Sequence, residues 1–382
     1  MAEKIPLSEP WFEGNEWQYV KDCLDRRWVS SAGAYVAEFE QTVAKYTGAT
    51  FAVAVQSGTA ALHLALLISD VQAGDLVLLP NVSFVASANA VTYAGASPVL
   101  FDVHQDHWQM DEDLVASFLH TECQLVDGNC LHTPSGRRVK AIMPVHALGL
   151  LAPSFALQRL AEEYQLIMIE DAAEALGSWL KDKHAGTIGS LGCLSFNGNK
   201  ILTTGGGGMI LTHSSELAAK AKHLSTQAKS HPRLYLHDEL GYNYRLSNIQ
   251  AALGVAQMEQ LQDILSLKEK IELRYREELV QAEWPLSFAR IHPESHPNYW
   301  LPSFCSSTVD QIRMALTEAN IQTRPLWSPL NRLPMYNHCR YITTEDHSGR
   351  IVDHSLSLPA FPALTDAQQS RIIKIIQQQL TR

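Results

Sequence analysis

Short apolar runs alternate with amphipathic stretches between about residues 51 and 212. The apolar runs predict buried strands at residues 51–55, 76–79, 98–102, 140–145 and 166–170. The stretches between them have helical spacing at residues 60–66, 83–93, 111–118 and 154–164. Strands that alternate with helices in this way predict a mostly parallel sheet covered by helices on both faces.

The pattern changes after Gln250. Residues 251–279 form one long helical pattern rich in Glu, Lys, Gln and Leu, with a break expected near Gln262. Past Pro285, prolines and aromatics interrupt shorter segments, and a last helix is expected from Asp366. We therefore predict a large α/β domain over residues 1–252, N-terminal segment included. A connecting helix and a smaller C-terminal α+β domain are predicted over residues 253–382.

Composition indicates a globular protein, because 46% of the 382 residues are hydrophobic and 18% are charged. The formal net charge of −10 and the lack of a long basic run argue against nucleic-acid binding. No apolar stretch reaches the roughly 18 residues of a membrane span, and the N-terminus lacks the apolar region of a signal peptide. We expect a cytoplasmic protein that contacts neither membrane nor nucleic acid.

Six cysteines are scattered without the spacing of a zinc site, which fits a reducing compartment. Cys123, Cys130 and His132 are close in sequence, but they match no zinc pattern. We interpret them as a loop with incidental thiols, and no metal is expected.

The turn at residues 56–60 joins a predicted strand to a helix that Ser57 caps. Free N–H groups and the positive end of the helix dipole suit such a turn to a phosphate. A plain helix cap explains the same residues, because every strand–helix junction needs one.

Asp171 directly follows a predicted strand, where ligands bind on open parallel sheets. Its carboxylate can hold a ribose hydroxyl, a metal or a protonated ring nitrogen. The ribose role lacks a Gly-x-Gly-x-x-Gly fingerprint upstream, and a metal needs more ligands nearby, such as Glu170 or Glu174. Glu170 is expected to face the other side of the sheet. A simple turn cap is the alternative for Asp171.

Lys200 ends the run Ser195-Phe196-Asn197-Gly198-Asn199-Lys200, and four glycines, Gly205 to Gly208, follow it closely. An amine held among small polar residues can attack a carbonyl and form a Schiff base. A surface lysine beside a flexible turn is the alternative. The glycines precede an apolar strand rather than a helix, so they predict close backbone approach and not a nucleotide loop.

A phosphate turn, a carboxylate and a lysine on successive strand ends match pyridoxal 5′-phosphate (PLP). This cofactor needs an anion cradle, an acid to keep its ring nitrogen protonated and an amine to hold its aldehyde. Phe84 is placed to face the ring, although a lone phenylalanine is more often a core residue.

Ordered sequence blocks support this interpretation, at residues 57–63, 83–90, 144–149, 170–177, 195–200 and 241–252. Through them the chain resembles the sugar aminotransferases of the DegT/DnrJ/EryC1/StrS family nearly end to end. The resemblance implies the type I (aspartate aminotransferase-like) PLP-dependent fold and a homodimer with shared active sites.

The resemblance also implies roles for individual residues. Lys200 looks like the lysine that holds the cofactor aldehyde, and Asp171 like the partner of the ring nitrogen. The phosphate would be held by Gly58, Thr59, Ala60 and Ser195, together with Asn243 of a second subunit. A glutamine or histidine is common where Glu174 stands, near the ring hydroxyl. A glutamate there needs a proton or a hydrogen-bonding neighbour.

Residues 196–208 look most like enzymes that move an amino group from L-glutamate to C4 of a UDP-linked 4-keto-6-deoxy-N-acetylhexosamine. The resemblance implies contacts to the nucleotide sugar from Trp28, Val29, Ser30, Ser31, His146, Arg324, Pro325, Leu326 and Trp327. Arg324 can pair with a diphosphate and Trp327 can stack on a ring, with interdomain packing as the alternative for both.

Other activities remain open at this point. The sugar can carry GDP or dTDP instead, and the amino group can go to C3. A PLP-dependent sugar dehydratase keeps the fold, but that branch of the family has a histidine where Lys200 stands. A regulator that binds PLP without catalysis is the third alternative.

Overall fold

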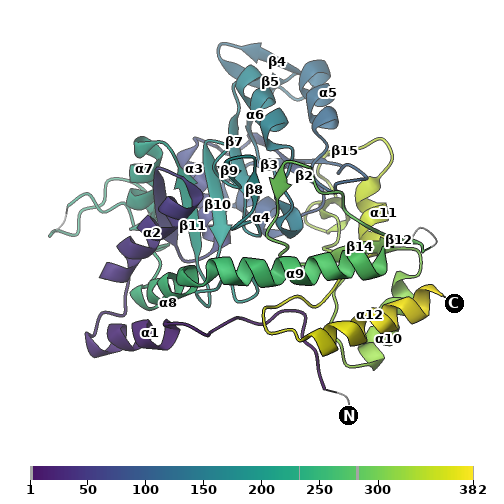
Figure 1. The fold of residues 1–382 in the computed structure, drawn as a ribbon. Helices are drawn as coiled ribbons and strands as arrows, with labels where there is room; N and C mark the ends of the chain where they lie inside the picture. The colour runs from purple at the N-terminus through teal and green to yellow at the C-terminus, as the bar shows by residue number, and fades with distance from the viewer. Residues whose placement is uncertain (1–2, 232, 281–283, 382) are drawn as a thin grey trace.

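The computed structural model describes residues 3–231, 233–280 and 284–381. Within these ranges a ten-stranded sheet forms the centre of the molecule (Figure 1). Its strands are β1 (Phe51–Val55), β2 (Leu76–Pro80), β3 (Ser97–Phe101), β4 (Cys123–Val126), β5 (Asn129–His132), β6 (Arg137–Ile142), β7 (Ile167–Asp171), β10 (Leu191–Ser195), β11 (Gly208–Thr212) and β15 (Tyr341–Ile342). The main path runs β1-β11-β10-β7-β6-β2-β3-β15, and only β11 is antiparallel to its neighbours there. The predicted mostly parallel sheet is confirmed.

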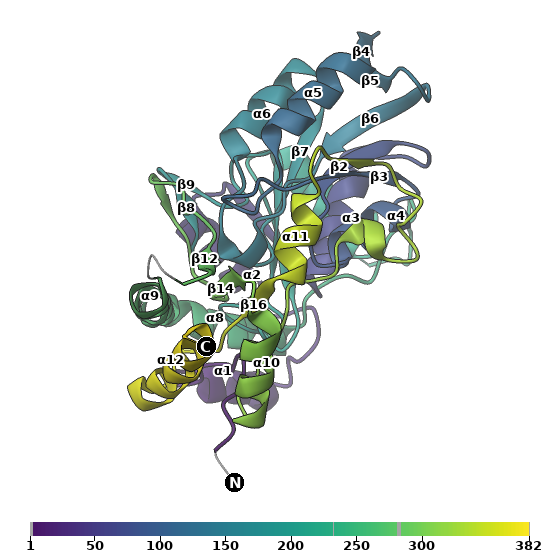
Figure 2. The same ribbon diagram turned by 90° about the vertical axis from the view of Figure 1, so that its right-hand side faces the viewer.

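Helices cover both faces of this sheet. They are α2 (Ala34–Thr47), α3 (Gly58–Ile68), α4 (Ala86–Tyr93), α5 (Glu112–Glu122), α6 (Ser154–Glu163), α7 (Ser215–Ser225) and α8 (Asn248–Glu259), while α1 (Glu16–Asp25) packs on α8. Successive residues of β2 belong to different cores, because Leu76 and Leu78 pack with α5 and α6, whereas Val77 and Leu79 pack with α3 and α4. Figure 2 shows these two pairs of helices on opposite sides of the sheet. None of the helices in the described ranges combines enough length and apolar character to traverse a lipid bilayer.

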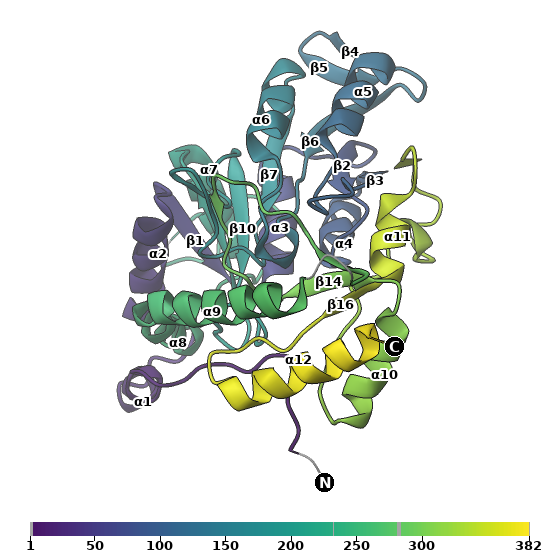
Figure 3. The same ribbon diagram turned by 45° about the vertical axis from the view of Figure 1, so that its right-hand side comes forward.

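A second, smaller core lies below the central sheet. It contains the antiparallel strands β12 (Leu286–Phe288), β14 (Ser303–Ser306) and β16 (Ser355–Ser357), with α9 (Leu261–Leu279), α10 (Val309–Glu318) and α12 (Asp366–Leu380). Figure 3 shows α9 across the lower edge of the central sheet, with α10 and α12 beyond it. Ile5 is fully buried in this core and pairs with Ile321. The N-terminal segment therefore packs against the smaller domain.

The long predicted helix is interrupted at Gln260, which ends α8 and begins α9, two residues before the expected break. The division between residues 252 and 253 falls inside α8, and this domain boundary stays a prediction. The strand expected at residues 140–145 is shifted, since β6 ends at Ile142.

The loop expected at Cys123–His132 is instead the β4–β5 hairpin, with Cys123 opposite His132. Asp127 and Gly128 both have positive φ at its turn, which is the backbone of a type I′ turn. In the sequence, the Asp127-Gly128 pair is the signal from which this hairpin turn can be predicted.

The chain also leaves the smaller domain and returns to the large one. Residues 327–354 contain the short helix η2 (Leu330–Arg332), β15 and α11 (His347–Asp353). β15 pairs with β3, which extends the central sheet. A further small sheet joins β8 (Trp179–Leu180), β9 (Lys183–His184) and β13 (Ser295–His296).

Candidate active site

A cavity of about 310 Å³ opens where β1, β7 and β10 end. These strands run in one direction, because β1 and β10 are both antiparallel to β11 and β10 is parallel to β7. Their carboxyl ends therefore meet at one edge, which is where open sheets bind ligands. The lining includes Ser57, Gly58, Thr59, Phe84, Asp171, Glu174, Ser195, Asn197, Asn199, Lys200, Trp300 and Trp327.

The turn before α3 forms one end of the cavity. Ser57 caps the helix, as predicted, and its Oγ accepts the Ala60 N–H at 3.0 Å. The resemblance implies that Ala60 helps to hold the phosphate, but its backbone N–H is already bonded to Ser57 and is not free for an anion. Within the described chain, the N–H groups of Gly58 and Thr59 donate to no protein acceptor. Two free donors at a helix N-terminus are suited to an anion.

The turn approaches neighbouring backbone and side chains closely. A Cβ on Gly58 would lie 2.8 Å from the Cβ of Ser195, and one on Gly208 would lie 2.4 Å from the carbonyl oxygen of Ser57. The predicted close approach at the glycine run is confirmed. Glycine at both positions brings the Ser195 hydroxyl beside the free N–H groups.

Asp171 is the last residue of β7 and its side chain is almost fully buried. One carboxylate oxygen accepts the Ser87 hydroxyl at 2.6 Å, and the other accepts the Ala173 N–H at 3.1 Å. Burial raises the pKa of Asp171, although these hydrogen bonds and the charge of Lys200 act in the opposite direction. Ser87 was not identified as a partner of Asp171 from the sequence. Its position in the family block at residues 83–90 was the only sequence signal for that role.

Glu170 faces away from Asp171, as the alternation of a strand requires. It is fully buried and accepts four donors: His146 Nε2 at 2.9 Å and the N–H groups of Gly186, Ile188 and Gly189 at 3.1, 2.8 and 2.7 Å. Burial alone would raise the pKa of Glu170, but these donors more than offset it and the pKa is lowered.

His146 is also fully buried, and it does not line the cavity. Its Nδ1 accepts the Ala152 N–H at 3.1 Å, so Nε2 carries the proton donated to Glu170. Both ring nitrogens are engaged by protein. This corrects the expectation that His146 contacts the substrate.

Lys200 and Glu174 meet inside the cavity, with Nζ 3.2 Å from Oε1. The other Glu174 oxygen accepts the Leu148 N–H at 2.9 Å. Leu148 has the left-handed φ of +63°, which costs a residue with a side chain about 1–2 kcal/mol. Burial raises the pKa of Glu174, while Lys200 and the Leu148 N–H lower it. Glu174 thus has the hydrogen-bonding neighbours it needs.

Trp300 is a wall of the cavity that sequence reasoning missed. Its ring centroid lies 4.2 Å from Lys200 Nζ, and its indole N–H donates to the Asn199 carbonyl at 2.6 Å. Trp327 stacks on Trp300 with the two ring planes 5° apart. Trp300 lies in no recognisable motif, and the only sequence signal for a role in the site is an aromatic residue between prolines.

Phe84 lies on the cavity lining with half of its surface exposed, so it is not a core residue. Its ring is open to a flat partner, as a residue facing a cofactor ring must be.

Several predicted site residues lie outside this cavity in the single chain. Trp28, Val29, Ser30 and Ser31 are exposed, and Asn248 binds the carbonyl oxygens of Trp28 and Ser30 at 2.8 and 2.7 Å. Asn243, Arg324 and Pro325 are exposed, and Leu326 is buried.

A larger cavity of about 630 Å³ lies between the starts of α5 and α6 and residues 290–295. None of the predicted site residues lines it. Its cations already have acidic partners, Arg290 with Asp106 at 3.8 Å and Lys181 with Glu294 at 3.3 Å. Cavity size alone therefore does not identify the site; the convergence of Lys200, Asp171 and the anion cradle does.

A sequence model described as the DegT/DnrJ/EryC1/StrS aminotransferase family matches residues 11–377. The chain belongs to this family. Similar relatives include the GDP-perosamine synthase of Escherichia coli O157:H7, 36% identical over 95% of both chains. EpsN of Bacillus subtilis (strain 168), whose name places it among pyridoxal phosphate-dependent aminotransferases, is 35% identical over 98% of this chain and 96% of that one. A crystal structure of a DegT DnrJ EryC1 StrS aminotransferase from Brucella abortus superposes with a TM-score of 0.89, at 27% identity and 96% coverage of both.

The chain is therefore a PLP-dependent sugar aminotransferase with the type I fold. Its own residues fit that cofactor. Gly58 and Thr59 offer free N–H groups for a phosphate, Phe84 leaves an open aromatic face, and Asp171 and Lys200 share the same cavity. A volume of about 310 Å³ is within the range of small-molecule sites, roughly 300–1,000 Å³.

Proposed function

We propose that this aminotransferase moves an amino group from L-glutamate to C4 of a nucleotide-linked 4-keto-6-deoxyhexose. The observation that supports it best is that Lys200, Asp171 and the free N–H groups at the start of α3 line one cavity. An amine, a buried acid and an anion cradle in one cavity are the three groups that amino transfer with PLP requires. A histidine at position 200 would favour the dehydratase branch instead.

The nucleotide is proposed to be GDP. The sequence around Lys200 had favoured a UDP-linked N-acetylhexosamine, and this is kept as the alternative. Similarity to a GDP-perosamine synthase across 95% of both chains supports a GDP-linked sugar more strongly than a short block does.

Bound PLP supplies an aldehyde that accepts the amino group and a ring that withdraws electrons from the reacting carbon. In this proposal Gly58, Thr59 and Ser195 bind its phosphate, and Phe84 covers one ring face. Asp171 is proposed to keep the ring nitrogen protonated, because the hydrogen bonds from Ser87 and Ala173 favour its charged form against the effect of burial.

Lys200 is proposed to move the proton at the substrate carbon, because it lines the cavity and its amine can accept and donate a proton. Glu174 and Trp300 hold this amine from two sides while it is charged, at 3.2 Å and 4.2 Å. Glu174, whose Oε1 lies 3.2 Å from Lys200 Nζ, is proposed to bind the ring hydroxyl in place of the common glutamine or histidine.

The nucleotide sugar is proposed to lie against Trp327, with its diphosphate on Arg324. The Arg324 guanidinium forms no hydrogen bond or ion pair within the described residues, so it is free to bind an anion. Trp28, Val29, Ser30, Ser31 and Asn243 are proposed to complete the site in a homodimer, each chain supplying part of its partner's cavity.

The test is an assay of purified, PLP-loaded protein with L-glutamate and a panel of GDP-, UDP- and dTDP-linked keto sugars. The expected product is a GDP-linked 4-amino sugar, with its position and configuration read by NMR and with one 2-oxoglutarate formed per sugar. Lys200→Ala is expected to lose turnover by about 10⁴-fold or more.

Appreciable sugar amination by Lys200→Ala would overturn the assignment of the lysine. Turnover of UDP-linked sugars alone would replace GDP with UDP. Conversion of glutamate without amination of any sugar would contradict the proposed substrate class.

A further inference from the structure

Residues 324–331 connect the two domains, and Trp327 of this segment lines the cavity. At one end Arg324 pairs with Ser357 of β16, where the Ser357 N–H donates to the Arg324 carbonyl at 2.7 Å, and the Leu326 N–H donates to Ser355 Oγ at 3.3 Å. At the other end Leu330 and Asn331 bind Asn81, which follows β2 of the central sheet. Trp327 therefore lies between an attachment to each domain.

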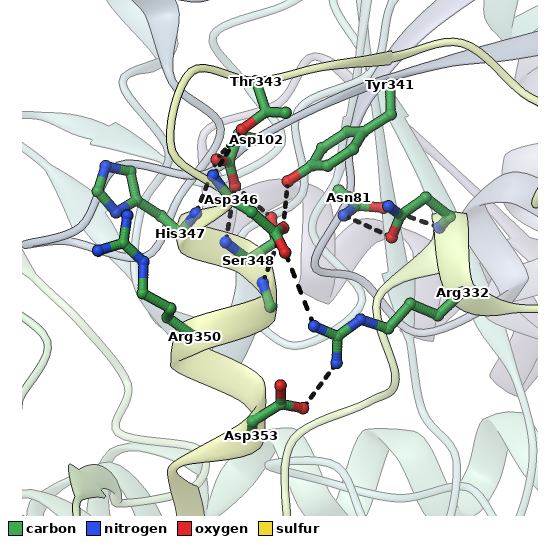
Figure 4. Close-up of polar contacts among 12 residues, drawn as sticks. Asn81, Asp102, Arg332, Tyr341, Thr343, Asp346, His347, Ser348, Arg350 and Asp353 are labelled. Atoms are coloured by element: carbon green, nitrogen blue, oxygen red, sulfur yellow. Dashed lines mark hydrogen bonds and ion pairs between the residues drawn. The ribbon is translucent and has the colours of Figure 1, made fainter.

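Asn81 forms a dense set of hydrogen bonds at the larger domain's end. It is fully buried, and its own N–H donates to the Phe101 carbonyl at 2.7 Å. Its carbonyl accepts the Leu330 N–H at 2.9 Å, and its Oδ1 accepts the Asn331 N–H at 2.9 Å. Its Nδ2 donates to Asn331 Oδ1 at 3.0 Å. Figure 4 labels Asn81 and draws dashed contacts from it to the neighbouring segment.

A second attachment holds the same excursion of the chain farther on. Asp102, fully buried at the end of β3, accepts Thr343 Oγ1 at 2.7 Å, the His347 N–H at 2.8 Å and both donors of Ser348 at 2.6 and 2.7 Å (Figure 4). Burial would raise the pKa of Asp102, but these bonds lower it further than burial raises it. Residues 327–354 are thus tied to the large domain although both of their ends enter the smaller one.

The Asn81–Asn331 pair joins two aromatic walls of the cavity. Phe84 is three residues after Asn81, and Trp327 is four residues before Asn331. Pro329 and the fully buried Leu330 leave the intervening segment little freedom. A shift of Asn331 would therefore move Trp327 relative to Phe84 and Lys200.

We propose that Asn331 is a positioning residue for the nucleotide sugar: by pairing with Asn81 it fixes Trp327 and Arg324 against the large domain. Asn331 does not line the cavity, so it affects the bound sugar only through its hydrogen bonds to Asn81, which hold the segment that carries Trp327. This inference rests on the proposed function, in which Trp327 and Arg324 contact the sugar nucleotide.

The two half-reactions separate this role from general damage to the enzyme. L-Glutamate has no nucleotide, so in the proposed function its reaction uses neither stacking of a nucleotide sugar on Trp327 nor the diphosphate contact of Arg324. Displacing these residues raises the KM for the sugar, while the glutamate half-reaction, followed by cofactor absorption in single turnover without sugar, keeps its rate. A loss of stability alone would affect both half-reactions alike.

Asn331→Ala removes the acceptor and leaves Asn81 Nδ2 buried without a partner. We expect its KM for the nucleotide sugar to rise roughly ten- to a hundredfold, as misplacing a binding group by about 1 Å does. Asn331→Asp keeps an acceptor for Asn81 Nδ2 and is expected to restore most of the affinity. Arg332→Ala is the matched control: it removes the ion pairs to Asp346 and Asp353 in the same segment without touching Asn81, and is expected to leave the KM unchanged.

Hydrogen exchange read by mass spectrometry gives an answer that does not depend on the substrate. Exchange over residues 326–331 is expected to speed up in Asn331→Ala and not in Arg332→Ala. Unchanged exchange there, an unchanged KM, equal damage to the glutamate half-reaction, or no rescue by Asn331→Asp would each overturn the positioning role. If wild-type protein aminates no nucleotide sugar, the proposed function fails, while the exchange result still tests the attachment of the segment.

Discussion

Two neighbouring carboxylates, Glu170 and Glu174, are buried beside the same strand end, and yet their pKa values are shifted in opposite directions. Glu170 has four hydrogen-bond donors, which lower its pKa despite complete burial. Glu174 has one backbone donor and the Lys200 amine, and burial dominates, so its pKa is raised. The number of donors, rather than the depth of burial, decides the direction in which each pKa moves.

This difference predicts how the two groups affect stability as pH changes. Because the pKa of Glu174 is raised by folding, its contribution is fully present below the ordinary value of 4.5 and is lost as pH rises through the folded-state pKa. Glu174→Gln is thus expected to gain stability relative to wild type across that window, by at most about 1.4 kcal/mol per pH unit.

Glu170→Gln is the matched comparison with the opposite sign. The lowered pKa of Glu170 contributes stability that is present above the ordinary 4.5 and is lost as pH falls, so this variant is expected to be less stable than wild type at neutral pH. Urea unfolding of cofactor-free protein between pH 4 and 8 measures both differences. Parallel pH dependence in the two variants would contradict this account.

At the scale of elements, the site depends on the close contact between the α3 turn and the end of β10. The backbone at Gly58 is compatible with alanine, so a substitution there acts through space alone. A Cβ would lie 2.8 Å from the Cβ of Ser195, so one of these two segments, both proposed to bind phosphate, must shift.

Gly58→Ala is expected to weaken PLP binding roughly tenfold, since about 1.4 kcal/mol of lost anion contacts corresponds to that factor. Equilibrium dialysis with PLP measures the effect without any substrate. Gly198→Ala, where a Cβ meets nothing within 4 Å, is the control and is expected to bind PLP as wild type does. Equal affinity of Gly58→Ala and wild type would show that the turn does not cradle the phosphate.

Elements with strong local patterns were predictable, and elements that depend on distant partners were not. The strands near Leu76 and Ile167 are continuous apolar runs because parallel strands are buried on both faces. β15 has only two residues and exists because β3 offers it an edge, which no local pattern reveals. In the same way Lys200 and Asp171 were found through motifs, whereas Trp300 reaches Lys200 only after the chain has folded.

At the scale of the whole molecule, the single chain leaves part of the predicted site apart from the cavity. Asn243 and Trp28 are exposed and line no part of it. The segment before Asn243 also exposes large apolar side chains, with Tyr235 at 91% and Leu240 at 80%. Such residues in a surface segment are typical of an interface, and a second copy of the chain is the partner that the proposed function requires.

Shared sites predict complementation between two inactive variants. Lys200→Ala lacks the amine of its own cavity, and Asn243→Ala lacks the group proposed to reach the partner's cavity. In a mixed dimer, one cavity then carries both defects and the other carries neither. Random re-pairing of equal amounts, after mild dissociation and refolding together, is expected to restore roughly a quarter of wild-type activity. Mixing either variant with itself is the control and is expected to restore none. If Asn243 acted within its own chain, every cavity of the mixed dimer would hold one defect and activity would stay absent.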